Sequence, residues 1–275
     1  MASSEGHPKF NNPPVIEVYF RQYFETLAGL KTPHIGIFWD IVKSNFPSFE
    51  AKPYLPPQIE TFENPPQNQK PRVLQIPAMQ RTWFLSETEN EILQIQPDQL
   101  ITNWRKISPE DRYPHYDEIV EKYFQYSNLF ESFISDRELG EIKNNQLELT
   151  YINHITSSNG WTPDAPLEEI FPSFRASSSQ NNFLPKIDSV NWTNTYVLPN
   201  QEGRLYATIR TVWHKKYSNE PIIQFQLLVR GIGEDCSPEG IRSWFDQAHD
   251  WIVLSFGELT SEQVQCRNWE KQDGS

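Results

Sequence analysis

The stretch that decides the fold runs from Leu205 to Val229 and reads LYATIRTVWHKKYSNEPIIQFQLLV. Apolar and polar residues alternate at both of its ends, which is typical of strands that bury one face. The apolar positions are Leu205, Ala207, Ile209 and Trp213, followed by Ile223, Phe225, Leu227 and Val229. The polar run Tyr217-Ser218-Asn219-Glu220 between them is typical of a turn. We therefore expect two antiparallel strands.

The opposite side of these two strands is polar, with Tyr206, Thr208, Arg210, Gln224, Gln226 and Arg230. The equivalent surface in the first half of the chain includes Gln94, Gln96 and Arg105. Amide, hydroxyl and guanidinium groups can hydrogen-bond a partner, and Arg and Tyr are frequent anchors of interfaces. A sheet that simply shows its polar side to water produces the same pattern. Both interpretations stay open.

A histidine on another expected strand adds to this surface. Residues 147–155 alternate with period two, and His154 follows Asn153 there. The pair fits a polar patch at a binding surface, and it equally fits a hydrogen-bonded structural histidine. We include His154 among the candidate partner-binding residues.

The remaining elements follow from periodicity and from helix-capping residues. A strand is expected at 16–20, and a short helix begins at Thr32-Pro33 and ends before Pro47. The run 82–106 predicts a three-stranded meander, and Ser108-Pro109-Glu110 predicts the start of a long helix that extends toward Leu139. The second half predicts a strand at 147–155, a short helix at 167–174, strands at 187–197, 205–213 and 222–229, and a long helix after Ser237-Pro238-Glu239.

The two halves show the same order: strand, short helix, three-stranded meander, long helix. This predicts an α+β fold of pseudo-duplicated units, with a mainly antiparallel sheet and two long helices packed on one face. We expect a flexible tail at 1–12 and halves at 13–140 and 141–275, which can form one continuous domain. The order resembles the duplicated sheet and helices of the TATA-binding-protein-like fold.

Residues 53–71 contain six prolines together with many Gln, Asn and Glu residues. Proline removes a backbone donor and fixes φ, so neither a helix nor a central strand can continue through this stretch. We expect an extended and mobile surface connection.

The overall composition is that of a folded, acidic protein. The formal net charge is −12 and aromatic residues make up 13% of the chain. This charge disfavours non-specific binding to duplex nucleic acid and permits a basic partner. The two cysteines, Cys236 and Cys266, exclude a disulfide framework. With no long apolar run and no leader pattern, we expect a cytoplasmic protein without a membrane span.

No catalytic, metal-binding or cofactor-binding motif occurs in the sequence. Its eleven glycines form no phosphate-binding loop, and no Gly-x-Ser-x-Gly pattern is present. The six histidines are isolated from one another, so none provides a pair of ligands on one helical face. We therefore expect no cofactor and no metal, and a function other than catalysis.

Two runs combine a tryptophan with cations at the ends of expected strands, Trp104-Arg105-Lys106 and Trp213-His214-Lys215-Lys216. Such a pairing can stack a base and hold a phosphate. Tryptophans that anchor the strand ends in the core, with the cations reaching outward, explain the same residues.

Several passages together resemble an uncharacterised, sporadically distributed prokaryotic protein family. They are Phe10-Asn11-Asn12-Pro13-Pro14-Val15-Ile16-Glu17-Val18, Trp83-Phe84-Leu85-Ser86, Leu93-Gln94-Ile95-Gln96-Pro97-Asp98, Asn103-Trp104-Arg105-Lys106, Tyr151-Ile152-Asn153-His154-Ile155, and the tail from Ala248-His249 through Phe256 to Leu259-Thr260. The resemblance covers nearly the whole chain. It implies no activity, ligand or catalytic residue.

These observations favour a recognition protein that binds another protein through its polar sheet face or its loops. An acidic chain suits a basic partner, as an immunity or antitoxin factor does, and sporadic distribution is typical of mobile conflict systems. One alternative is a ligand-binding or enzymatic pocket between the helices and the sheet. Another is nucleic-acid binding through the sheet, which the resemblance in fold order suggests.

Overall fold

One antiparallel sheet organises the molecule in this computed structural model, which describes residues 7–62, 79–174, 187–213 and 220–272. Its nine described strands lie in the order β2-β3-β4-β5-β1-β6-β9-β8-β7. Their bounds are β1 Val15–Phe24, β2 Ser48–Lys52, β3 Arg81–Leu85, β4 Glu91–Gln96, β5 Gln99–Arg105, β6 Asn144–Ile155, β7 Asn191–Val197, β8 Gly203–Trp213 and β9 Pro221–Gly231. The expected α+β class and antiparallel sheet are confirmed.

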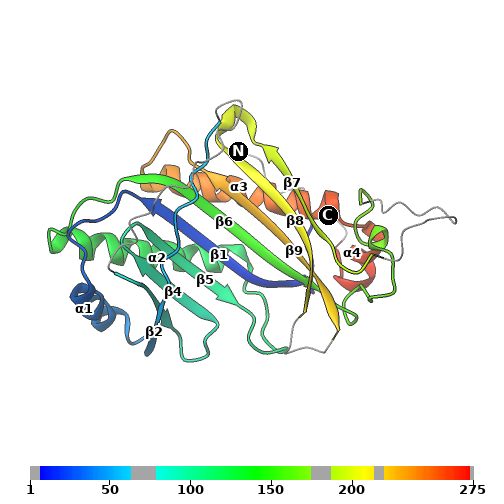
Figure 1. Cartoon of the computed structure of the whole chain (residues 1–275), viewed down its shortest axis with the longest axis horizontal. Helices are drawn as coiled ribbons and strands as arrows, with labels where there is room; N and C mark the ends of the chain where they lie inside the picture. The colour runs from blue at the N-terminus through cyan, green and yellow to red at the C-terminus, as the bar shows by residue number, and fades with distance from the viewer. Residues whose placement is uncertain (1–6, 63–78, 175–186, 214–219, 273–275) are drawn as a thin grey trace.

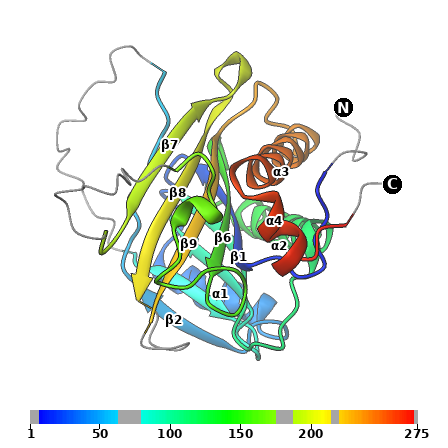
Figure 2. The ribbon, with the colours of Figure 1, turned by 90° about the vertical axis from the view of Figure 1, so that its right-hand side faces the viewer.

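The helices lie against one face of this sheet (Figures 1 and 2). They are α1 Thr32–Val42, α2 His115–Asp136, α3 Pro238–Leu259 and α4 Glu262–Asn268, with short 3₁₀ turns η1 Leu167–Glu169 and η2 Pro199–Gln201. The side chain of Ser237 accepts a hydrogen bond from the backbone N–H of Gly240, so it caps α3 as the sequence predicts. No helix among the described residues is long and apolar enough to cross a membrane.

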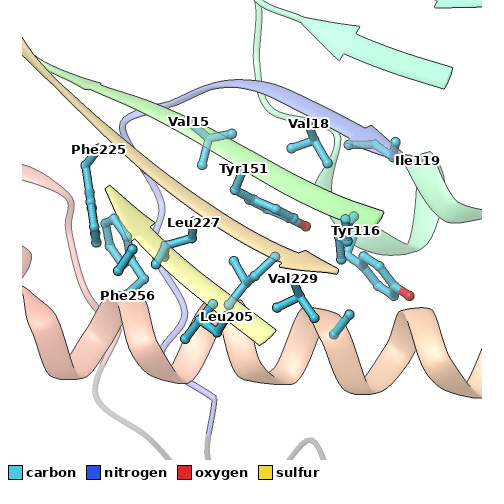
Figure 3. Packing of buried hydrophobic residues seen from close by; sticks show 14 of the residues in the cluster. Val15, Val18, Tyr116, Ile119, Tyr151, Leu205, Phe225, Leu227, Val229 and Phe256 are labelled. Carbon is cyan, nitrogen blue, oxygen red and sulfur yellow. The ribbon is translucent and has the colours of Figure 1, made fainter. Parts of the chain in front are cut away.

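The core fills the space between the sheet and the long helices. Figure 3 shows side chains of β1, β6, β8 and β9, among them Leu205 and Leu227, directed toward Phe256 of α3 and Tyr116 of α2. Phe20 of β1 lies at the meeting point, with ring centroids 5.4 Å from Tyr123 of α2 and 5.0 Å from Phe245 of α3. Both helices therefore pack on the same side of the central strand.

The alternation read from the sequence decides which strand face meets the helices. The register pairs Leu205 with Val229 and Ala207 with Leu227, and all four belong to the core. Because side chains of a strand alternate between faces, the residues between them lie on the opposite side. We call that side the helix-free face.

Helix α2 begins later than the sequence predicts. Residues 108–114 form turns outside the helix, held by the carboxylate of Asp111, which accepts hydrogen bonds from the backbone N–H groups of Ile107 and Ser108. A helix that began at Pro109 would place Pro114 inside its second turn, where proline lacks the N–H and clashes with the preceding turn. Helix α2 therefore begins at His115.

Other differences concern short elements. Strand β7 begins at Asn191 instead of 187, and the helix expected at 167–174 is only the single turn η1. Strand β2 has four exposed residues in five, and α4 has seven residues, so neither shows the periodicity of a long amphipathic element. Strand β2 is held in the sheet by antiparallel pairing with β3 over five residue pairs.

The two ends of the described chain lie side by side. Phe10 forms a bridge with Lys271, and its ring lies 5.4 Å from Phe256 and 6.4 Å from Trp269. Trp269 is fully buried. Part of the segment expected to be a tail is thus packed against α3 and the C-terminal segment.

Candidate functional site

All ten candidate partner-binding residues lie on the helix-free face. The register places each of them opposite another residue of that face, for example Thr208 opposite Gln226 and Arg210 opposite Gln224. They are Gln94 and Gln96 of β4, Arg105 of β5, His154 of β6, Tyr206, Thr208 and Arg210 of β8, and Gln224, Gln226 and Arg230 of β9. Sequence alternation identified the face correctly, and binding by these residues stays a prediction.

Charge is segregated between the two sides of the molecule. The seven lysine and arginine residues of the nine described strands all lie on the helix-free face: Arg21, Lys52, Arg81, Arg105, Arg204, Arg210 and Arg230. Three strand carboxylates accompany them there: Glu17, Glu50 and Glu148. The helices α2 and α3 together carry nine acidic residues and two cations. The helix-free face of the sheet therefore has more positive than negative strand residues, although the net charge of the chain is −12.

A buried ionic cluster lies near the middle of this face. The Glu148 side chain is 1% exposed, and its Oε2 accepts hydrogen bonds from Arg230 Nε at 2.6 Å and from the Tyr23 hydroxyl at 3.1 Å. Arg21 Nη1 lies 3.5 Å from Glu148 Oε1 and donates to the Tyr23 hydroxyl at 2.8 Å. Arg230 also lies 3.3 Å from the carboxylate of Glu60, which pairs with Arg204 as well. Three guanidinium groups therefore share two carboxylates, and the cluster retains positive charge.

An extended segment of the chain, residues 53–62, crosses the helix-free face, and we call it the strap. In Figure 1 it passes in front of the strands on the side away from α2 and α3. At its start the Tyr54 hydroxyl donates to Asp98 Oδ2 at 2.5 Å. The side chain of Gln96 then contacts the backbone of Leu55 twice, accepting from its N–H at 3.2 Å and donating to its carbonyl at 2.8 Å.

The second half of the strap is held in the same manner by β6, β8 and β9. Gln146 donates to the backbone carbonyl of Gln58 at 2.6 Å and accepts from the N–H of Glu60 at 2.7 Å. The carboxylate of Glu60 accepts from Arg204 at 2.5 Å, from the Tyr206 hydroxyl at 2.7 Å and from Arg230 at 3.3 Å. These contacts join residues that are far apart in sequence.

Residues 53–62 are extended as expected, and these contacts hold them against the sheet, so this part of the connection does not extend freely into solvent. Residues 63–71 of that prediction lie outside the part of the chain that the structure describes. Three candidate binding residues, Gln96, Tyr206 and Arg230, hold the strap. They are therefore occupied within the chain itself.

The other seven candidates lie beyond the strap contacts. Gln94 accepts from Arg81 and donates to Asn103, and Arg105 pairs with Glu89. These residues, with the 3.0 Å contact between the Thr208 and Thr193 hydroxyls, form a hydrogen-bonded polar surface. On the same surface, His154 Nε2 lies 3.4 Å from Gln224 Nε2. Gln226 lies on β9, and Arg210 is exposed to solvent.

Sequence reasoning missed the first-half cations that complete this face. The Nε atoms of Arg21 and Arg81 and the indole Nε1 of Trp83 are buried and have no hydrogen-bond partner among the described residues. Burial, together with the nearby Arg21 guanidinium, lowers the pKa of Arg81. The same alternation that identified Gln94 places Arg81 and Trp83 beside it, so this signal was present in the sequence.

Three cations surround the ring of Trp83. Lys52 Nζ lies 4.6 Å from the ring centroid, and the guanidinium carbons of Arg81 and Arg105 lie 5.5 Å and 5.9 Å from it. Contacts of this kind hold flexible cations on an aromatic surface. Together with Arg21, these residues form a cationic patch over β1, β2, β3 and β5, in which Lys52 pairs with Glu50 and Arg105 with Glu89.

The two tryptophan and cation runs have different outcomes. Trp104 is 6% exposed and lies in the core, with its ring 5.6 Å from Tyr113. The core-anchor interpretation is correct for this residue. Trp213 is 68% exposed, so it is not a core anchor, and residues 214–216 lie outside the described part of the chain.

A hollow and a histidine packed against a tyrosine lie on the helix side of the sheet. A hollow of about 280 Å³ lies between α2 and the start of α3, and its lining includes Ser127, Glu131 and Cys236. The described residues contain no group of three side chains able to hold a metal ion. His249 stacks on Tyr116 with ring centroids 4.0 Å apart, and burial, followed by the neighbouring His7, lowers its pKa to about 3. The ring of His249 is therefore packed between α3 and α2.

Comparisons with known proteins add no relatives to this picture. No family model, curated protein or solved structure matches the chain.

Proposed function

We propose that this chain is a non-catalytic recognition protein that binds a protein partner through the helix-free face of its sheet. The observation that carries the proposal is the segregation of charge, since all seven strand cations lie on that face while α2 and α3 are strongly acidic. A sheet that merely shows its polar side to water has no need to place seven cations against three strand carboxylates on that side.

The charge of the face indicates the chemistry of its partner. A cationic surface attracts acidic groups, and complementary charge increases the rate and specificity of association. We therefore propose a partner that presents carboxylates to this face. A basic partner, such as the toxin of an immunity or antitoxin pair, would instead be attracted to the acidic layer of α2 and α3, so the two ideas differ in the surface used.

We further propose that the sheet arose from two equivalent halves, 13–140 and 141–275. The support is the strand order, in which β5-β4-β3 follow β1 on one side and β9-β8-β7 follow β6 on the other. Each half contains one helix of 22 residues, α2 in the first and α3 in the second, and α4 follows α3 in the second half. The arrangement resembles the TATA-binding-protein-like order, and the broad sheet face is the surface that such a fold offers to a partner.

The binding proposal is tested by comparing partner capture by matched variants at physiological salt. Arg210→Ala removes an exposed cation of the helix-free face, and Lys43→Ala removes an exposed cation directly after α1 that pairs with Asp40. We expect one protein from the native host to be retained by the wild type and by Lys43→Ala, and to be lost with Arg210→Ala. Equal retention by both variants, or no specific retention by any of the three proteins, would refute binding through this face.

A second candidate function is binding of single-stranded nucleic acid. The observation that favours it is Trp83 with three cations near its ring, because aromatic rings beside cations stack bases and hold phosphates. Fluorescence anisotropy with a labelled oligonucleotide at low salt tests it. Binding that weakens with salt and with Trp83→Ala supports this candidate, and no binding at low salt removes it.

A further inference from the structure

The strap shows how the helix-free face holds an extended peptide. From β5, where Gln99 donates to the carbonyl of Leu55, it reaches β8, where Arg204 holds Glu60. Four strand spacings between β5 and β8 amount to about 19 Å. Residues 55–60 in polyproline conformation span about 16 Å, whereas the same residues in a helix span about 8 Å. Only an extended chain makes this crossing.

Most of the contacts along the strap do not depend on its sequence. Gln96, Gln99 and Gln146 bond to backbone N–H and carbonyl groups, which every non-proline residue offers. Specific side-chain contacts occur at the two ends, where Asp98 accepts from Tyr54 and where the Arg204, Tyr206 and Arg230 side chains hold Glu60. The face therefore recognises an extended backbone with a phenol and, six residues later, a carboxylate.

The strap is bound with little apolar burial. The side chain of Glu60 is only 8% exposed, but no strap residue is buried as a whole, and Ile59 is 39% exposed. Its prolines restrict the backbone to extended conformations, so little entropy is lost when the strap binds the sheet. A segment held mainly by polar contacts at the surface opens with a smaller free energy than the core. Such a segment can leave without unfolding the sheet.

We propose that the strap is an internal ligand of the helix-free face, and that an extended, carboxylate-bearing segment of a partner protein replaces it. This deepens the proposed function, on which it rests, by naming the kind of segment bound and the step that regulates access. While the strap is in place, Gln96, Tyr206 and Arg230 are occupied, so the apparent affinity for the partner is reduced by the fraction of molecules in which the strap is closed.

The test uses the full chain and a fluorescent synthetic peptide with the sequence of residues 53–62. Glu60→Ala removes the carboxylate that anchors the strap, and Glu87→Ala removes an exposed carboxylate in the β3–β4 turn as the matched control. In anisotropy titrations we expect Glu60→Ala to bind the peptide at least about 10-fold more tightly than the wild type and Glu87→Ala do. A strap that is closed about nine-tenths of the time in the wild type lowers the apparent affinity by this factor, and the substitution opens it. A peptide with Gln at the position of Glu60 should bind at least about 10-fold more weakly.

Hydrogen exchange provides a second measurement in the wild type. Excess peptide should increase the exchange of the Leu55 and Glu60 amides, which donate to Gln96 and Gln146, while the core strands keep their protection. Peptide binding that is equally weak for all three proteins, or unchanged exchange of the strap at saturating peptide, would overturn the proposal. The outcome is separable from that of the proposed function: a native partner bound equally by wild type and Glu60→Ala leaves recognition intact and refutes strap replacement.

Discussion

Glu148 gives the sharpest test of the physical account of the sheet face. Glu148→Gln keeps the size and shape of the side chain and removes its charge. The carboxylate is 1% exposed and balances Arg21 and Arg230, whose side chains are 16% and 11% exposed. After the substitution the two guanidinium groups, largely removed from water, lose the counter-charge that they share, and Arg230 keeps only its longer contact with Glu60 at 3.3 Å.

The size of the effect follows from burial. Breaking a buried ion pair by removing one partner costs about 3–5 kcal/mol, because the remaining charge is uncompensated. An unfolding entropy of about 2.1 cal/mol/K per residue implies a shift of about 2 °C per kcal/mol for a chain of this length. Glu148→Gln should therefore lower the melting temperature by about 6–10 °C.

The assay is urea and thermal unfolding followed by circular dichroism, with an exposed carboxylate as control. Glu141 pairs with Lys143, and its side chain is 77% exposed, so Glu141→Gln should change the stability by less than about 0.5 kcal/mol. The double variant Glu148→Gln/Arg230→Gln should lose at least about 1 kcal/mol less than the two single losses added together. A loss below about 1 kcal/mol for Glu148→Gln, or simple additivity, would show that this cluster does not carry the charge balance described.

Two further predictions concern the helix side and the tryptophans. Because the pKa of His249 falls from about 6.5 in the unfolded chain to about 3 in the fold, the unfolded state binds the extra proton below pH 6.5, and stability decreases as pH falls from there toward 3. At pH 5 the free energy of unfolding is expected to be about 2 kcal/mol lower than at pH 7 because of this group. His249→Phe, which keeps the stacking on Tyr116, should remove that part of the loss in urea titrations at the two pH values, and the same pH dependence in both proteins would contradict it. Trp104→Ala should cost about 3–5 kcal/mol, whereas Trp213→Ala at its 68% exposed position should cost below about 0.5 kcal/mol, so similar unfolding midpoints would contradict the assigned burial.

Local sequence patterns predicted the strands of the second half and the side of each strand that meets the helices. Alternation at 205–213 and 222–229 was sufficient, since a strand has only two faces and its apolar residues must leave water. The same pattern placed Arg210 and Arg230 on the helix-free face. The cap of α3 was readable because Ser237 acts on a backbone N–H only three residues away.

The sequence by itself determined composition, element type and the polar or apolar side of each strand, because these depend on neighbours a few residues apart. Only the tertiary structure decided the strand order, the pairing of the polar strand β2, and the position of the strap on the sheet. Glu60 and Arg204 lie 144 residues apart, and Tyr54 and Asp98 lie 44 apart, so their contacts exist only once the sheet has assembled. Proline excluded a helix or strand for residues 53–62, and the hydrogen-bonding groups of distant strands then fixed where that extended chain lies.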